Sequence, residues 1–317
     1  MDIIQSNPKW QRNFVMQVDG RMPKINGVDD PKSQKHFTIS MPLTMKFDVD
    51  RAALASQGLG LFKIYNLAEE TRRSLYHVWM ELDPSDQQSI SVFAGYHSQP
   101  ALGLIFSGCV RWCRSYRTGV DWITEMECIS TNLGMLSGNI TLTIPKSSSG
   151  QPVDGKALIR SLLSNVKYTR FGGSGSIVLN PTRALSFLGK PAEVFQQIVG
   201  MGGKVTVFSD NGCLFALRDN EYLQRTGDTG LVITSDMILG SPSRDNGIIT
   251  VKTFLEPRVF PGCLVKLSSR DKDYNGPRKC IGFKHTGSIS AAECGEATTE
   301  MSLWVGSGDL VAVPMEV

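Results

Sequence analysis

Three cysteines and one histidine are of the types that bind transition metals. Cys109 and Cys113 are four residues apart, with His97 upstream and Cys128 downstream. Within a strand this spacing places both thiols on one face. A structural zinc site needs four ligands, usually in two close pairs, and no second pair accompanies this one. We therefore interpret these cysteines as buried free thiols and expect neither a metal site nor a cofactor.

Two carboxylates, Glu125 and Glu127, have the spacing of residues on one face of a strand. Glycoside hydrolysis requires a general acid in an apolar setting and a second carboxylate across a cleft. Neighbouring glutamates on a hairpin are more typical of a solvated face or a subunit contact. None of the histidines joins a Ser or Cys in a nucleophile motif; they are His36, His77, His97 and His285.

Two glycine-rich runs have the composition of phosphate-binding loops. Residues 200–204 read Gly-Met-Gly-Gly-Lys, but a phosphate loop follows a strand, precedes a helix and has Ser or Thr after the lysine. Here Val205 follows Lys204, a helix is predicted before the run and a strand after it. We interpret the run as a helix-to-strand turn with a glycine cap. Residues 172–175 also lack the strand–turn–helix context, so we expect no catalytic or cofactor-binding residues and no enzyme activity.

Basic and aromatic residues interleave in one segment, as in some strands that bind single-stranded nucleic acid. Arg111, Arg114 and Arg117 surround Trp112 and Tyr116. The formal net charge is only +3, whereas a dedicated DNA-binding protein carries a strong basic excess. We favour a strand with one solvated or partner-facing side.

The cysteine count indicates a reducing compartment. An odd number at irregular spacing is a poor disulfide framework, and residues 1–30 contain no apolar block of the kind a signal peptide or membrane anchor needs. We expect free, mostly buried thiols and no disulfide among the seven cysteines, which are Cys109, Cys113, Cys128, Cys213, Cys263, Cys280 and Cys294.

Hydropathy patterns predict a strand-rich chain of 317 residues, with 31 glycines and 15 prolines for its turns. Asn66 and Glu69 have the form of a capping box at the start of a helix over residues 67–82. Shorter helices are predicted at 156–166 and 191–199, and Asn211-Gly212 predicts a hairpin. The predicted strands cover residues 13–18, 44–50, 61–65, 90–96, 104–115, 122–129, 204–208, 213–217, 248–255, 263–268, 279–283 and 298–305.

Eight blocks in order, from about residue 40 to the C-terminus, resemble the baseplate hub proteins of contractile-tail bacteriophages, the family that adapts a tail tube to a spike. The blocks are residues 47–50 (FDVD), 64–72 (IYNLAEETR), 94–96 (AGY), 104–108 (LIFSG), 121–128 (DWITEMEC), 239–243 (LGSPS), 251–258 (VKTFLEPR) and 261–267 (PGCLVKL).

The resemblance implies a mainly β (α+β) fold with two tube-like antiparallel β-barrel domains and a small α/β insert. We assign residues 1–36 to an N-terminal extension, 37–145 to a first barrel with an inserted helix, 146–230 to the α/β domain and 231–317 to a second barrel. Sequence patterns agree, with a strand-rich unit at each end and helices between.

The same resemblance implies a structural function. Three chains would form a homotrimeric ring of six barrels that links the sixfold tail tube to the threefold spike and lets DNA pass without specific binding. The channel lining should then be polar or acidic, because a basic lining would hold DNA through phosphate contacts. We therefore expect Arg111, Arg114 and Arg117 to point towards other protein and not into the channel. Other baseplate proteins and the tape measure protein are further expected partners, in a virion tail assembled in the host bacterial cytoplasm. A cell-wall-degrading or nucleic-acid-binding tail-associated protein is the alternative.

Overall fold

The computed structural model describes residues 11–19, 36–52, 58–75, 77–78, 88–130, 139–144, 153–164, 166, 170–179, 184–201, 205–291, 295–306 and 309–316. The described fold is mainly β, as predicted, with few and short helices. Among these residues, none of the helices has the length and apolar composition that crossing a membrane requires.

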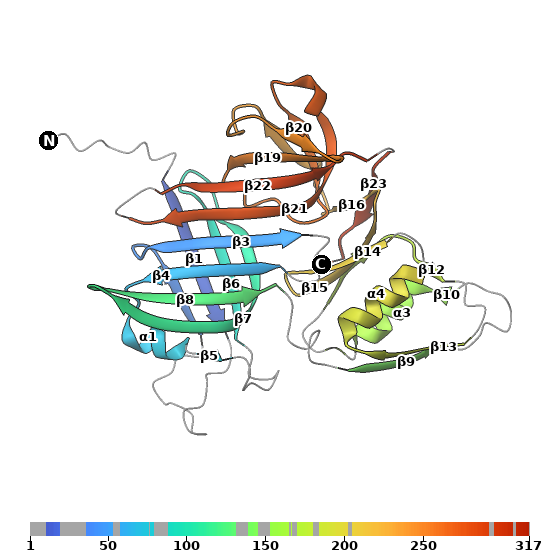
Figure 1. Ribbon diagram of the computed structural model, residues 1–317, viewed down its shortest axis with the longest axis horizontal. Helices are drawn as coiled ribbons and strands as arrows, with labels where there is room; N and C mark the ends of the chain where they lie inside the picture. Colours follow the sequence, from blue (N-terminus) through green and yellow to red (C-terminus); the bar gives the residue numbers. More distant parts are fainter. Residues whose placement is uncertain are drawn as a thin grey trace.

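One long sheet contains most of the strands (Figure 1). Its fourteen strands include the path β18-β19-β22-β21-β3-β4-β8-β7-β6-β1-β2, with β5, β17 and β20 attached beside it. The first-unit elements are β1 (Arg12–Asp19), β2 (His36–Ser40), β3 (Met45–Ala52), β4 (Leu59–Tyr65), α1 (Glu69–Ser74), β5 (His77–Val78), β6 (Ser89–Tyr96), β7 (Gly103–Thr118) and β8 (Asp121–Ile129).

The second strand-rich unit continues the same sheet. It is joined to the first by antiparallel pairing of β21 with β3, from Met45 opposite Ile289 to Ala52 opposite Gly282. Its elements are β17 (Leu231–Thr234), β18 (Ser243–Asp245), β19 (Ile248–Phe254), β20 (Leu264–Ser268), the 3-10 helix η4 (Lys272–Tyr274), β21 (Gly276–Ile289), β22 (Ala297–Trp304) and β23 (Val311–Pro314).

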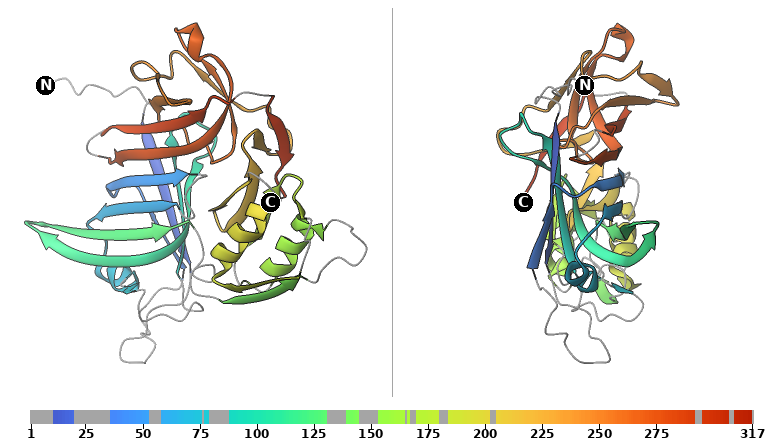
Figure 2. Two further views of the ribbon diagram at one scale, coloured as in Figure 1. Left: turned by 45° about the vertical axis from the view of Figure 1, so that its right-hand side comes forward. Right: turned by 90° about the vertical axis from the view of Figure 1, so that its left-hand side faces the viewer.

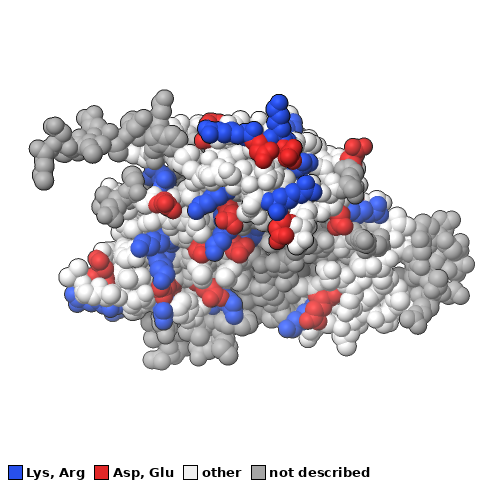
Figure 3. Space-filling model, turned by 45° about the horizontal axis from the view of Figure 1, so that its top comes forward, with Lys and Arg blue, Asp and Glu red and all other residues white. Residues whose placement is uncertain are grey.

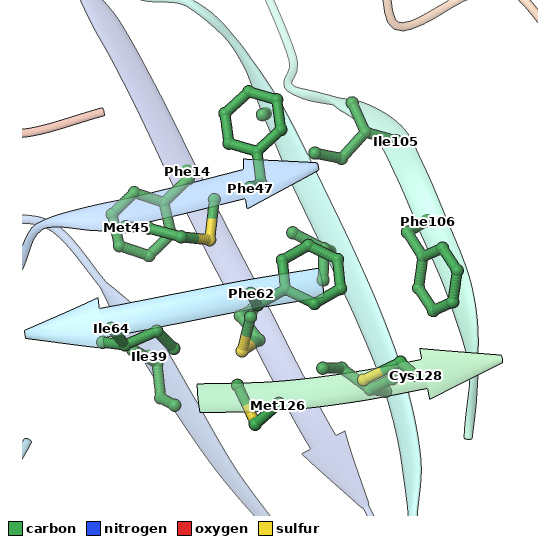
Figure 4. Packing of buried hydrophobic residues seen from close by; sticks show 14 of the residues in the cluster. Phe14, Ile39, Met45, Phe47, Phe62, Ile64, Ile105, Phe106, Met126 and Cys128 are labelled. Atoms are coloured by element: carbon green, nitrogen blue, oxygen red, sulfur yellow. The ribbon is translucent and has the colours of Figure 1, made fainter. Parts of the chain in front are cut away.

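Alternating buried and exposed side chains along the strands explain how the first unit forms its core. In β3 the side chains of Met45, Phe47 and Val49 are buried while the residues between them are not. Strands β1 and β6 cross behind β3, β4 and β8 at a steep angle (Figure 1), and the two layers enclose an apolar core. Figure 4 shows Phe14 from β1 and Phe62 from β4 within this core.

Strand β1 lies in the segment that the sequence assigned to an N-terminal extension. It pairs with both β6 and β2, and Phe14, Met16 and Val18 are fully buried in the first core. The described part of that segment is therefore integral to the first unit, and a boundary at residue 36 would separate β1 from the strands that it pairs with.

The helix predicted at 67–82 is much shorter than expected. Helix α1 starts at Glu69 and ends at Ser74, no side chain caps it, and His77 already belongs to β5. The capping-box prediction is wrong because Asn66 serves another element. Its backbone is left-handed, with φ 59°, and its side-chain oxygen accepts the Trp122 amide at 3.0 Å. Residues 76 and 79–82 lie outside the described part.

The α/β insert has a core of its own, in which helix α4 packs against β14 and helix α3 against β11. Both predicted helices are present, and Asn211-Gly212 forms the predicted hairpin with positive φ angles of 49° and 73°. The elements are β9 (Ile140–Ile144), β10 (Val153–Asp154), α3 (Gly155–Leu163), β11 (Arg170–Ser174), β12 (Val178–Leu179), β13 (Leu185–Gly189), α4 (Pro191–Met201), β14 (Val205–Asp210), β15 (Cys213–Arg218) and β16 (Glu221–Gln224).

The end of the chain returns from the second unit to the insert. Strand β23 pairs in parallel with β16, and the Glu316 amide donates to the Gly172 carbonyl at 2.9 Å. The Glu316 carboxylate binds Lys156 at 2.7 Å and also Arg160, both on α3. The insert is therefore fastened to the rest of the molecule at the C-terminus as well as through its own connections.

Candidate functional site: the polar face of the long sheet

The face of the long sheet that points away from the first core is polar across both units. Register places its residues in rows that cross seven strands, from β19 through β22, β21, β3, β4 and β8 to β7. We call this the polar face. Its cations are Lys46, Lys63, Arg111, Arg114, Lys252 and Lys284, and its carboxylates are Asp48, Asp50, Glu125, Glu127 and Glu300.

Glu125 is the most enclosed charge on the polar face. Its carboxylate binds Lys63 Nζ at 2.6 Å and Arg114 Nη2 at 2.7 Å, and it accepts the Tyr116 hydroxyl at 3.0 Å. Burial alone would raise the pKa of Glu125, but the bonds from Lys63, Arg114 and Tyr116 outweigh it and lower that pKa to about 2. Glu125 is therefore held ionised and is unsuited to act as a general acid.

Further ion pairs extend along the same face. Arg111 Nη1 binds Glu127 at 2.7 Å, and Lys284 Nζ binds Asp48 at 3.0 Å across the junction of the two units. The hydrogen bond with Asp48 raises the pKa of Lys284. Basic and acidic side chains are interspersed over the side of the molecule drawn in Figure 3, without one large patch of either sign.

The three arginines of β7 do not share one environment. Arg111 and Arg114 contact carboxylates of their own chain on the polar face. Arg117 pairs in register with Trp122, on the opposite face of the hairpin, and its Nε donates to the Gly119 carbonyl.

The metal-site candidates are not brought together. A β-bulge between Val110 and Trp112 adds one residue to β7, so Cys109 packs with Ile129 while Cys113 lies in the first core. The prediction that both thiols share a face is wrong for this reason. Cys128 is also in the core and His97 is exposed in a turn. Nowhere in the described ranges do three or more His, Cys, Asp or Glu side chains form a metal-binding group.

The histidines are dispersed, as the sequence predicted. His36 is exposed, with its Nδ1 atom 2.7 Å from Asp19 Oδ1. His285 is fully buried in β21. The side chain of His77 lies outside the described part. The run at 200–204 lies between a helix and a strand, as predicted, because α4 ends at Met201 and β14 begins at Val205. The glycine cap predicted there falls on residues 202–204, which lie outside the described part. Gly172 and Gly173 lie within strand β11 and not in a loop.

A buried polar junction between the sheet and the insert was not predicted. Arg51 of β3 is 2% exposed and its guanidinium binds the carboxylate of Asp210 in β14, with Nε to Oδ1 at 2.7 Å. Arg51 also donates to the Ile105 carbonyl at 2.9 Å and lies over the Phe283 ring. The sequence contained one indication of this junction, because Arg51 stands at a position of β3 where the alternating pattern predicts a buried side chain.

A hollow of about 660 Å³ lies between the insert and β23 and contains two carboxylates. Each of them already has a structural contact. Asp154 caps α3 by accepting the Lys156 amide at 2.9 Å, and Glu221 accepts the Arg218 amide at 2.8 Å. Both of these contacts are with backbone amides, and neither joins a carboxylate to a Ser, Thr or Cys side chain.

No family model matches the chain, and no curated protein matches it in sequence. The 43 kDa tail protein of prophage MuSo2 from Shewanella oneidensis is similar in structure, with a TM-score of 0.55 over 92% of this chain and 98% of that chain, at 9% identity. The chain has the fold of a phage tail protein. A chain of the lidded Francisella PdpA–VgrG complex is also similar, with a TM-score of 0.52 over 98% of this chain and 55% of that chain, at 6% identity.

The likeness to this tail protein includes the two strand-rich units and the insert together, across nearly the whole length of both chains. Several ion pairs of the described residues lie on the polar face. The residues singled out for catalysis, Glu125 and Glu127, are bound by cations on that face.

Proposed function

We propose that the chain is a structural hub component of a phage tail that links the sixfold tail tube to the threefold spike and forms part of the DNA channel. The observation that carries the proposal is the continuous polar face, which spans two strand-rich units in one sheet. The structural likeness to a phage tail protein over 92% of this chain and 98% of that chain supports it.

The edges of the sheet support assembly with further copies. Strand β7 pairs with β8 throughout its second half, whereas the described strand on its other side, β5, covers only Trp112 and Cys113. Backbone amides of Ser115 and Arg117 point to that same outer side, because residues alternate along a strand. The β7–β8 hairpin also projects beyond the rest of the molecule (Figure 2), with Val120 at its tip 84% exposed.

Three copies joined at such edges would close into a ring, since a heterologous interface closes when its rotation permits. Open strand edges are a hazard for a lone chain, and pairing in a ring removes them. In this arrangement the polar face lines the channel. Arg111 and Arg114 would then lie in the channel beside their carboxylates, which replaces the expectation that they contact another protein.

The proposed partners follow from this position: two further copies of the chain, the tail tube protein, the spike protein, other baseplate proteins and the tape measure protein. The proposed site is the virion tail, with assembly in the host bacterial cytoplasm. We propose no enzyme activity, because Glu125 is held ionised by three neighbours, whereas a glycosidase acid needs a raised pKa.

Oligomeric state tests the proposal. Analytical ultracentrifugation of the purified full chain should give a trimer, and a mixture with its tail tube protein should give that trimer in a heavier complex. A hub interface should be obligate and bury more than about 2,000 Å² per contact, so the trimer should survive dilution. A chain that stays monomeric in both samples, or that assembles into a ring of six chains, contradicts the proposal.

A further inference from the structure

Four cations of the polar face are accessible to solvent yet directed at carboxylates. The side chains of Lys63, Arg111, Arg114 and Lys284 are 50%, 45%, 56% and 45% exposed. Glu125, which binds two of them, is only 12% exposed. Glu125 and Glu127 are thus more enclosed than the cations that bind them, whereas Asp48 is about as exposed as Lys284.

Strand register fixes these pairs. Glu125 of β8 lies directly opposite Lys63 of β4 on one side and Arg114 of β7 on the other. The bulge next to Val110 leaves Arg111 outside the ladder, and its side chain reaches Glu127. Because backbone pairing holds these partners on adjacent strands about 4.8 Å apart, the pairs are part of the sheet and not chance surface contacts.

Phosphate contacts are what would make a channel hold DNA. Each lysine or arginine that neutralises a phosphate adds to the affinity, because it releases a condensed counterion. A cation that already has a carboxylate partner gains less free energy from binding a phosphate, and the carboxylate also repels the phosphate. We infer that Asp48, Glu125 and Glu127 are built-in counterions that keep passing DNA from binding the polar face.

This inference rests on the proposed function, which places DNA at this face. Its test is the full-length D48N/E125Q/E127Q variant with a short fluorescein-labelled DNA duplex, followed by fluorescence anisotropy over a range of salt concentrations. The substitutions remove the carboxylates that bind Lys63, Arg111 and Arg114, and one of the carboxylates near Lys284, which keeps Asp50 opposite it in register. We expect affinity at least about tenfold higher than wild type at about 50 mM salt, and a salt slope steeper by about 2 to 4 phosphate contacts.

A matched control changes net charge equally elsewhere. Glu70, Glu193 and Asp309 are exposed and lie off the polar face, so E70Q/E193Q/D309N should bind DNA within about threefold of wild type. Equal binding by the triple variant and this control overturns the inference. Circular dichroism checks folding, and if the triple variant is unfolded, the single E127Q variant must show tighter, more salt-dependent binding than E193Q, or the inference fails.

The two proposals fail separately. A chain that does not assemble into a trimer contradicts the proposed function, whatever its affinity for DNA. An assembled trimer whose triple variant binds the duplex no more tightly than the control contradicts only the role of the carboxylates.

Discussion

Arg51 of β3 and Asp210 of β14 form a buried ion pair that joins the long sheet to the α/β insert. Their side chains are 2% and 7% exposed, and two guanidinium nitrogens reach the two carboxylate oxygens. Next to Asp210, the Ser130 hydroxyl donates to the Ser209 carbonyl. At the other end of β15, Lys279 Nζ donates to the Arg218 carbonyl at 2.7 Å. The insert is thus held by polar contacts whose partners come from the sheet.

Removal of one partner of this pair should be costly. An uncompensated buried charge typically costs about 3 to 5 kcal/mol, so D210N should lower the free energy of unfolding by about that amount. Urea unfolding followed by tryptophan fluorescence and circular dichroism measures it. The R51M/D210L variant removes both charges and should lose less than D210N. An equal decrease in the free energy of unfolding in the two variants would show that the unpaired buried charge of Arg51 is not what destabilises D210N.

Acid should weaken the contacts of Glu125. Its folded pKa is about 2 against an ordinary 4.5, so the unfolded chain binds the proton first and stability falls as pH drops through that window. E125Q should be less stable than wild type by about 1 kcal/mol near pH 7, and the gap should close as pH approaches 2. Chemical unfolding at several pH values tests this, and E193Q is the control. A gap that stays constant with pH would refute the prediction.

Acid should also act through His285. The ring is fully buried, Nδ1 lies 2.8 Å from Thr299 Oγ1, and burial together with the Arg51 charge lowers its pKa to about 3. The unfolded chain therefore binds a proton that the folded chain does not between about pH 6.5 and 3, and stability falls with pH over that range. H285Q should flatten this dependence, whereas H36Q at an exposed histidine should not. The same pH dependence of stability in wild type, H285Q and H36Q would contradict this prediction.

The thiols should be free and slow to react. The six described cysteines form no disulfide in the structure and are buried, and burial raises the pKa of Cys113 to about 12, so little reactive thiolate forms. We expect intact-mass spectrometry of unreduced protein to show no disulfide. Iodoacetamide should modify these six only after denaturation. Cys294 lies outside the described residues. A mass lower by two hydrogens per bridge, or fast labelling of Cys113 in native protein, would contradict this.

Local patterns predicted most strands, because alternating burial is a property of neighbouring residues. The alternation in residues 44–50 corresponds to β3, and Asn211-Gly212 marks the β14–β15 turn. The capping box failed for a non-local reason, since the Asn66 side chain bonds the hairpin at Trp122. The short α1 likewise reflects β5 pairing with β7.

The polar face was only partly predictable. Glu125 and Glu127 were recognisable as residues of one strand face, but their partners depend on which strands become neighbours. Lys63 meets Glu125 only because β4 pairs with β8, and Lys284 meets Asp48 only because β21 pairs with β3. The bulge that separates Cys109 from Cys113 also has no reliable sequence signal, because it depends on the partner strand.

The most direct measurement is an electron cryo-microscopy map of the assembled tail tip. The account predicts three copies around the axis, each contributing both strand-rich units, with the polar face inward and the outer edge of β7 against a neighbouring copy. A single copy in the particle, a sixfold ring of single units, or a polar face turned away from the axis would contradict it.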